Sequence, residues 1–245
     1  MFDRNFHTVY ALTMFDRLFE TFAFFRTFIF DIARFLVPVA LPVVLLEIYL
    51  SSRAMEAENA GLIHWVPFMI NFVYRPVYTG GLIWVISCIV GGDAWSVRQG
   101  FMEGLRYWKD LLVVYIVSSV MIFAGLLALV VPGLLLFARL SLAEFGVVLE
   151  GMNPKQALFA SNQRVRGFTG EVLACGLTLS FMILALDILM GYFAARMGLQ
   201  GFLTAVASAL IFIVLSSTVT ILFYRFYDLA LKREGEGPAP VRIED

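Results

Sequence analysis

The sequence has few charged residues, few cysteines and few histidines for its length. Of its 245 residues, 15% are charged, two are cysteine and two are histidine, and the formal net charge is −1. Disordered chains and nucleic-acid-binding domains carry more charge, mostly of one sign, so both classes are excluded. Cys88 and Cys175 stand alone within apolar stretches, which excludes a disulfide framework and a zinc site. Hydrophobic residues are in excess: they make up 60% of the chain, more than one soluble core of this size holds.

Long apolar segments predict six helices that cross a membrane, because a spanning helix needs about 20 mostly apolar residues. Pro132 and Gly133 separate two of these segments, and this pair predicts a tight turn between two helices. The predicted spans are residues 31–50, 66–90, 111–131, 134–150, 172–193 and 202–223. The expected fold class is therefore all-α, a polytopic membrane helix bundle.

The distribution of lysine and arginine predicts the orientation of the spans. Fourteen of the 18 basic residues fall in the terminal segments and in the connections after the second and fourth spans. The opposite connections hold only Arg53 and Arg196, and Arg75 and Arg139 lie within spans. Because positive charge marks the cytoplasmic side, both termini are expected in the cytoplasm.

Three amphipathic segments precede the three pairs of spans and are expected to lie as short helices in the headgroup plane, here called elbow helices. Asp93 is expected to cap the second, and Asn153 followed by Pro154 to open the third. The elbow helices cover about residues 8–30, 93–109 and 153–168, which gives three elbow-plus-hairpin units. Residues 1–231 are predicted to form a single transmembrane domain, and residues 232–245 a disordered cytoplasmic tail.

An ordered series of short motifs resembles the YciC-like family of bacterial inner-membrane proteins. The motifs are Val131-Pro132-Gly133, Glu150-Gly151-Met152-Asn153-Pro154 and Ala157-Leu158-Phe159-Ala160-Ser161. More loosely, they resemble the membrane domain fused to some glycerophosphodiester phosphodiesterases. The resemblance implies six spans, a bacterial inner-membrane location and a structural motif built on Pro132, Gly133 and Ser161. It implies no reaction.

Charged side chains inside a span are costly and are therefore candidate functional residues. Arg75 either coordinates an anionic lipid headgroup or a substrate carboxylate, or it pairs with Glu144 or Asp187 to hold the bundle together. Arg139 and Glu144 lie five residues apart, so each is expected to find its partner on another span. The candidate ligand or lipid residues within the spans are Arg75, Tyr78, Arg139 and Glu144.

No motif singles out a catalytic residue, a metal site or a cofactor site, so none is predicted. The favoured interpretation is a non-enzymatic inner-membrane protein that binds lipids or membrane proteins, a second copy of itself included, and no nucleic acid. Anionic headgroups are expected to meet the basic side chains of the elbow helices, namely Arg98, Arg106, Lys155, Arg164 and Arg166. The alternative is a small-molecule or lipid transporter that uses the intramembrane charges. An enzyme acting on lipid headgroups is disfavoured, because such proteins carry their catalytic site in a separate domain.

Overall fold

The structure, a computed structural model, describes residues 14–56, 65–199 and 201–235. Over these ranges the chain is helical and contains no strand, which confirms the all-α class. Six segments within them are long and apolar enough to cross a membrane, which makes this a multi-pass membrane protein. The helices are α1 (Met14–Glu56), α2 (Trp65–Gly91), α3 (Val97–Arg106), α4 (Trp108–Ala128), α5 (Val130–Leu140), α6 (Ala143–Glu150), α7 (Pro154–Val165), α8 (Thr169–Arg196) and α9 (Phe202–Glu234).

α1 joins the first expected elbow helix and the first expected span in one long helix. Phe28, with φ −109° and ψ 15°, departs from helical geometry and bends α1 between these two parts. Sharp bends often occur at proline, but Pro38 and Pro42 both lie beyond this one. Residues 8–13 of the expected elbow lie outside the described residues.

The second elbow helix begins later than expected. Its N-cap is Ser96, whose side-chain oxygen accepts a hydrogen bond of 3.2 Å from the backbone amide of Gln99. The expectation that Asp93 caps this helix is wrong, because Asp93 takes part in the end of α2. Gly92, at φ +77°, turns the chain out of α2, and the amide of Asp93 then donates to the carbonyl oxygen of Cys88 at 2.9 Å. The expected elbow at 93–109 is thus shortened, and its last residues belong to α4.

The turn between the third and fourth spans lies at Leu129 and not at Pro132 and Gly133 as expected. Leu129 is extended, with φ −164° and ψ 146°, and separates α4 from α5. Pro132 is the third residue of α5, where a helix has no intrahelical partner for the amide that proline lacks. Gly133 allows a close approach: a Cβ there would lie 2.5 Å from Cγ of Leu126. The pair therefore starts α5 and packs it against α4.

The fourth span is divided at Ser141 and Leu142, whereas the sequence predicts one helix over residues 134–150. Ser161 of α7 lies against this break. Its hydroxyl donates a hydrogen bond of 2.7 Å to the carbonyl oxygen of Arg139 and accepts one of 3.1 Å from the amide of Leu142. Backbone groups freed by a break in a membrane helix must find partners within the protein. Ser161 supplies them and fixes α7 to the break.

α7 begins as the sequence predicts. The side chain of Asn153 accepts a hydrogen bond from the backbone amide of Gln156 at 3.0 Å, and Pro154 is the first helical residue. Proline is favoured at this position because its fixed φ suits the helix and no donor is lost.

α9 continues well past residue 223, where the sixth predicted span ends. It extends to Glu234, so the predicted tail boundary at residue 232 is wrong for residues 232–234. Lys232 supports this last turn, because its ammonium group pairs with Asp228 one turn earlier at 2.6 Å. The rest of the predicted tail, residues 236–245, lies outside the described residues.

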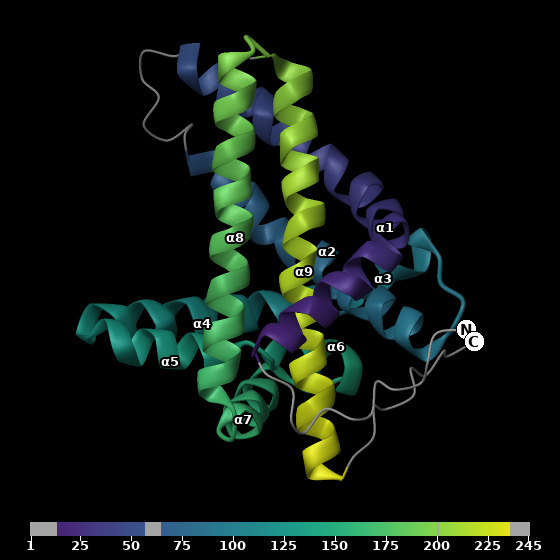
Figure 1. Cartoon of the computed structure of the whole chain (residues 1–245), viewed down its shortest axis with the longest axis vertical. Helices are drawn as coiled ribbons and strands as arrows, with labels where there is room; N and C mark the ends of the chain where they lie inside the picture. The colour runs from purple at the N-terminus through teal and green to yellow at the C-terminus, as the bar shows by residue number, and fades with distance from the viewer. Residues whose placement is uncertain (1–13, 57–64, 200, 236–245) are drawn as a thin grey trace.

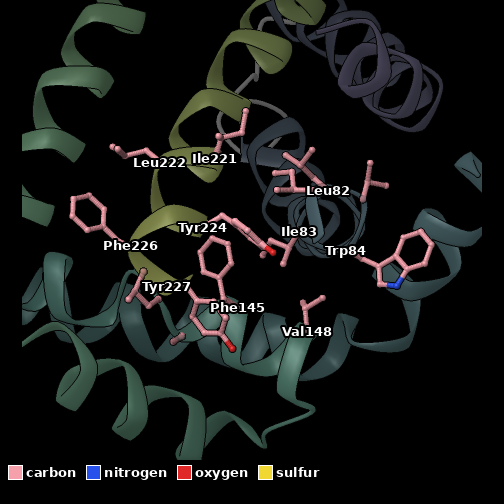
Figure 2. Close-up of a cluster of buried hydrophobic side chains, with 14 of the residues drawn as sticks. Leu82, Ile83, Trp84, Phe145, Val148, Ile221, Leu222, Tyr224, Phe226 and Tyr227 are labelled. Carbon is pink, nitrogen blue, oxygen red and sulfur yellow. The ribbon is translucent and has the colours of Figure 1, made fainter. Parts of the chain in front are cut away.

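The large buried side chains gather at one end of the apolar helices, in a cluster here called the basal core. Figure 2 shows residues of α2, α6 and α9 meeting there: Leu82, Ile83, Trp84, Phe145, Val148, Ile221, Leu222, Tyr224, Phe226 and Tyr227. From this end, α4 with α5 and α8 with α9 extend as two hairpins that run crosswise to each other (Figure 1). Along residues 115–132 and 184–216 no described side chain is buried. The outer parts of both hairpins therefore rely on lipid as their solvent.

Candidate functional site

The short helices α3 and α7 expose basic and large apolar side chains together. On α3, Arg98 is exposed and Met102, one turn later, is 55% exposed. On α7, Lys155 is exposed and Phe159, again one turn later, is 64% exposed. Residues one turn apart lie on the same helix face. A face that combines basic and large apolar side chains is typical of helices in the headgroup region of a membrane.

Two more basic residues that the sequence predicts to meet lipid, Arg106 and Arg166, are also exposed. Arg106 lies 3.7 Å from the carboxylate of Glu103 on the same helix and over the ring of Tyr107 at 5.6 Å. Exposed ion pairs of this kind contribute little to stability and exchange readily with other anions. The structure therefore leaves Arg98, Arg106, Lys155 and Arg166 exposed.

Arg164, the fifth predicted lipid-contacting residue, is held inside the protein. Its side chain is only 5% exposed, and its guanidinium binds both carboxylate oxygens of Glu150 and, at 3.1 Å, the carboxylate of Glu234. Tyr227 donates its hydroxyl proton to Glu150, and its ring lies 5.5 Å from Cζ of Arg164. The bonds to Glu150 raise the pKa of Arg164 above its ordinary value. The expectation that Arg164 contacts headgroups is therefore corrected: its donors are committed within the protein.

Glu150, Arg164, Tyr227 and Glu234, here called the Arg164 cluster, connect three helices. Glu150 ends α6, Arg164 lies in α7, and the other two residues lie in the last turns of α9. The ring of Tyr227 also stacks on Phe145 of the basal core, with centroids 5.5 Å apart. Bidentate arginine–carboxylate contacts are among the stronger hydrogen-bonded pairs and fix relative orientation. The cluster thus closes the basal core on its polar side.

Two further ion pairs tie the first part of α1 to the hairpin of α8 and α9. Arg17 lies 3.0 Å from the carboxylate of Glu171, and Glu20 lies 2.6 Å from the guanidinium of Arg225. Arg17 also stands over the ring of Phe226, with Cζ 5.3 Å from its centroid. These polar residues of the first elbow therefore face other helices. The sequence, in contrast, predicts that they face the lipid headgroups.

Within the apolar helices, Arg75 of α2 and Glu144 of α6 meet through Tyr115 of α4. The guanidinium of Arg75 lies over the ring of Tyr115, 5.4 Å from its centroid. Tyr115 in turn interacts electrostatically with the carboxylate of Glu144. Tyr78 lies close enough to interact electrostatically with both charged groups. Of the two carboxylates considered as partners of Arg75, only Glu144 acts on it, and Tyr115 lies between the two charges without a direct ion pair among the described residues.

Arg139 takes no part in this arrangement. Its Nε is buried and has no hydrogen-bond partner among the described residues, while its carbonyl oxygen accepts the bond from Ser161. Asp187, the other partner considered for Arg75, lies on α8 and is not among the groups that act on Arg75. The transport hypothesis combined Arg75, Arg139 and Glu144, and the structure unites only the first and the third.

Sequence reasoning missed the residues that complete these clusters: Tyr115, Glu150, Tyr227 and Glu234. Tyr115 lies within an uninterrupted apolar stretch, where nothing distinguishes it from a lipid-facing tyrosine. Glu150 and Glu234 lie 14 and 70 residues from Arg164, so no helical periodicity relates them. One available signal is that each glutamate ends an apolar helix, where a carboxylate needs a partner or water.

Comparison with protein-family models, with curated protein sequences and with solved structures finds no match for this chain. The resemblance to the YciC-like family therefore stays a prediction. Among the described residues, no group of three or more histidine, cysteine, aspartate or glutamate side chains is placed to hold a metal ion.

Proposed function

We propose that this protein is a non-enzymatic inner-membrane protein that binds anionic lipid headgroups with α3 and α7. The observation that carries the proposal is the joint exposure of basic and apolar side chains on these two helices. Arg98 with Met102, and Lys155 with Phe159, each form such a pair one turn apart. The apolar member of a pair enters the acyl boundary while the basic member stays at the phosphate level.

The orientation follows from the distribution of basic residues. α3 and α7 lie in the two internal connections that are rich in lysine and arginine, which places them on the cytoplasmic side together with both termini. The cytoplasmic leaflet of a bacterial inner membrane carries anionic lipid. Each basic residue near such a surface contributes about 1 kcal/mol to binding before salt screening. Four such residues on two helices give a selective contact without any single deep site.

The experiment compares paired neutral substitutions on the two helices. R98Q/R106Q changes α3 and K155Q/R166Q changes α7, while R53Q/R196Q, on the opposite connections, is the matched control. Native mass spectrometry of each purified protein measures its preference for phosphatidylglycerol over phosphatidylethanolamine. We expect each helix variant to lose part of this preference and the combined variant to lose most of it, with the control unchanged. A preference that survives in the combined variant would contradict the proposal.

A further inference from the structure

Arg75 is a cation on the surface of the protein at membrane depth. It lies in the middle of α2 and is exposed, and among the described residues it forms no salt bridge with a carboxylate. A guanidinium has five N–H donors, and contact with the ring of Tyr115 leaves most of them available. Unsatisfied donors are costly in hydrocarbon, so the remaining ones require an acceptor from outside the protein.

The ring of Tyr115 holds this guanidinium in a defined orientation. Cζ of Arg75 lies 5.4 Å from the ring centroid, and Tyr115 also interacts electrostatically with Glu144. Contact with a ring face leaves the N–H edge of the guanidinium free. This edge matches two oxygens of a phosphate or carboxylate, which is the bidentate geometry that arginine favours.

The depth of Arg75 suits a lipid phosphate of the cytoplasmic leaflet. α3 lies along α2 over more than one turn, since a Cβ on Gly81 would lie 2.5 Å from the carbonyl oxygen of Gly100 and a Cβ on Gly104 would lie 3.0 Å from the carbonyl carbon of Val77. Arg75 precedes Val77 by two residues, about 3 Å along the helix, and so lies close to the level of the C-terminal end of α3. An arginine side chain at this level reaches the headgroups by extending toward them. This depth rests on the proposed placement of α3 in the headgroup region.

The surface beyond Arg75 suits acyl chains. Phe72 and Phe68, three and seven residues earlier, lie on the same face of α2, with rings stacked 6.2 Å apart, and Phe68 is 55% exposed. On α4, Ser118 lies one turn beyond Tyr115 and is partly exposed, while its hydroxyl oxygen is enclosed and has no hydrogen-bond partner among the described residues. It is a second polar group on the helix that positions the guanidinium.

From these observations we infer that Arg75 and Tyr115 form a binding site for the phosphate group of a single phospholipid, with its acyl chains along α2. The phosphodiester is common to zwitterionic and anionic phospholipids. The site therefore binds both, unlike the charge-selective surface on α3 and α7.

The test titrates delipidated protein with phosphatidylethanolamine and measures the first bound lipid by native mass spectrometry. Loss of charge-assisted hydrogen bonds weakens this binding in R75Q by about tenfold or more. R75K retains the positive charge but loses the bidentate guanidinium, so its affinity is expected to be intermediate. Y115F retains the ring but loses the hydroxyl, and its affinity is also expected to be intermediate. R53Q is the control and binds as the wild type does. Inorganic phosphate, added in excess as a competitor, does not displace the lipid.

The proposed site is wrong if R75Q binds the lipid as tightly as the wild type does. If R75Q does not fold, R75K is used instead, and an affinity of R75K equal to that of the wild type is the contradicting result. Displacement by inorganic phosphate overturns the lipid assignment in favour of a free phosphate. The two proposals fail separately. If the α3 and α7 variants keep their preference for phosphatidylglycerol while R75Q loses its bound lipid, only the proposed function fails. The converse result rejects only the site at Arg75.

Discussion

Gly104 of α3 lies directly against the backbone of Val77 of α2. A Cβ on Gly104 would be 3.0 Å from the carbonyl carbon of Val77, closer than van der Waals contact allows. Gly100, one turn earlier on α3, meets Phe35 of α1 in the same way, since a Cβ there would lie 2.7 Å from its ring. Close approach through small residues is a common way for helices to associate in membranes. The position of α3 in the bundle thus depends on glycine at positions 100 and 104, because any side chain there would collide with a neighbouring helix.

Substitution G104A is expected to displace α3 and to destabilise the protein by about 1–3 kcal/mol, the usual cost of overpacking. Backbone atoms surround the site, so no flexible side chain can move aside. The measurement is the thermal unfolding midpoint of the purified protein in detergent. The matched control is G170A in the first turn of α8, where a Cβ meets nothing within 4 Å. An unfolding midpoint for G104A at or above that of the control would contradict the close contact.

Removal of the Ser161 hydroxyl is expected to weaken the junction of α5 and α6. In S161A the carbonyl of Arg139 and the amide of Leu142 both lose their partner at a buried position. Leaving such groups unsatisfied costs about 1–3 kcal/mol. Hydrogen exchange of residues 139–145 is expected to speed up more than that of α9. S208A, whose hydroxyl bonds only within its own turn of α9, serves as control and leaves both unchanged.

Changing one residue of the Arg164 cluster is expected to be costly, and a second change is expected to add less than its own cost. R164M leaves two carboxylates without their cation, and E150Q leaves the guanidinium with one carboxylate, so each single change destabilises by about 3–5 kcal/mol. The double variant R164M/E150Q is expected to lose less than the sum of the two, which a double-mutant cycle of unfolding free energies measures. Strict additivity of the two changes would argue against the observed contact.

The same cluster predicts a flat response to alkaline pH. The pKa of Arg164 is raised above its ordinary value by its bonds to Glu150. A group with a raised pKa stabilises the folded state fully at pH values below its pKa in the unfolded chain. It loses this contribution only as the pH rises through its pKa in the folded protein. The unfolding midpoint of the wild type is therefore expected to change no more than that of R164M between neutral pH and about pH 10.

Cysteine labelling in intact cells checks the proposed orientation of the hairpins. L129C and L199C lie at the ends of the two hairpins that are farthest from the basal core and are expected to react with an impermeant maleimide added outside. K155C on α7 is expected to react only after permeabilisation. Cys88 and Cys175 are buried and give a low background. Protection of L129C alone would indicate that the crosswise hairpin of α4 and α5 lies within the membrane.

The apolar segments made the helical class predictable, because length and hydropathy alone distinguish a spanning helix. Asn153 followed by Pro154 likewise predicted the start of α7, since both residues act within one turn. The turn at Leu129 was not predictable in this way. Pro132 and Gly133 look like a turn, and their actual role depends on how tightly α5 packs on α4 at Leu126.

The candidate site was less predictable than the fold. Basic residues on the elbow helices are visible in the sequence, but whether each faces lipid or protein is decided by partners far along the chain. Lys155 and Arg164 lie on one helix, and among the described residues only the second finds carboxylates, from α6 and α9. Arg75 stood out as an intramembrane charge, while Tyr115 did not, because a tyrosine among apolar residues carries no signal of its own.

The side chains of the two hairpins are buried at one end only. This arrangement allows the protein to fit bilayers of different hydrophobic thickness. Neither residues 115–132 nor residues 184–216 hold a buried side chain, so tilting a hairpin changes lipid contacts and leaves the basal core intact. A thinner bilayer is matched by greater tilt, at a fraction of a kcal/mol per ångström of mismatch. Elastic adaptation is thereby confined to the outer turns, and the surface formed by α3 and α7 keeps one geometry while the membrane around it varies.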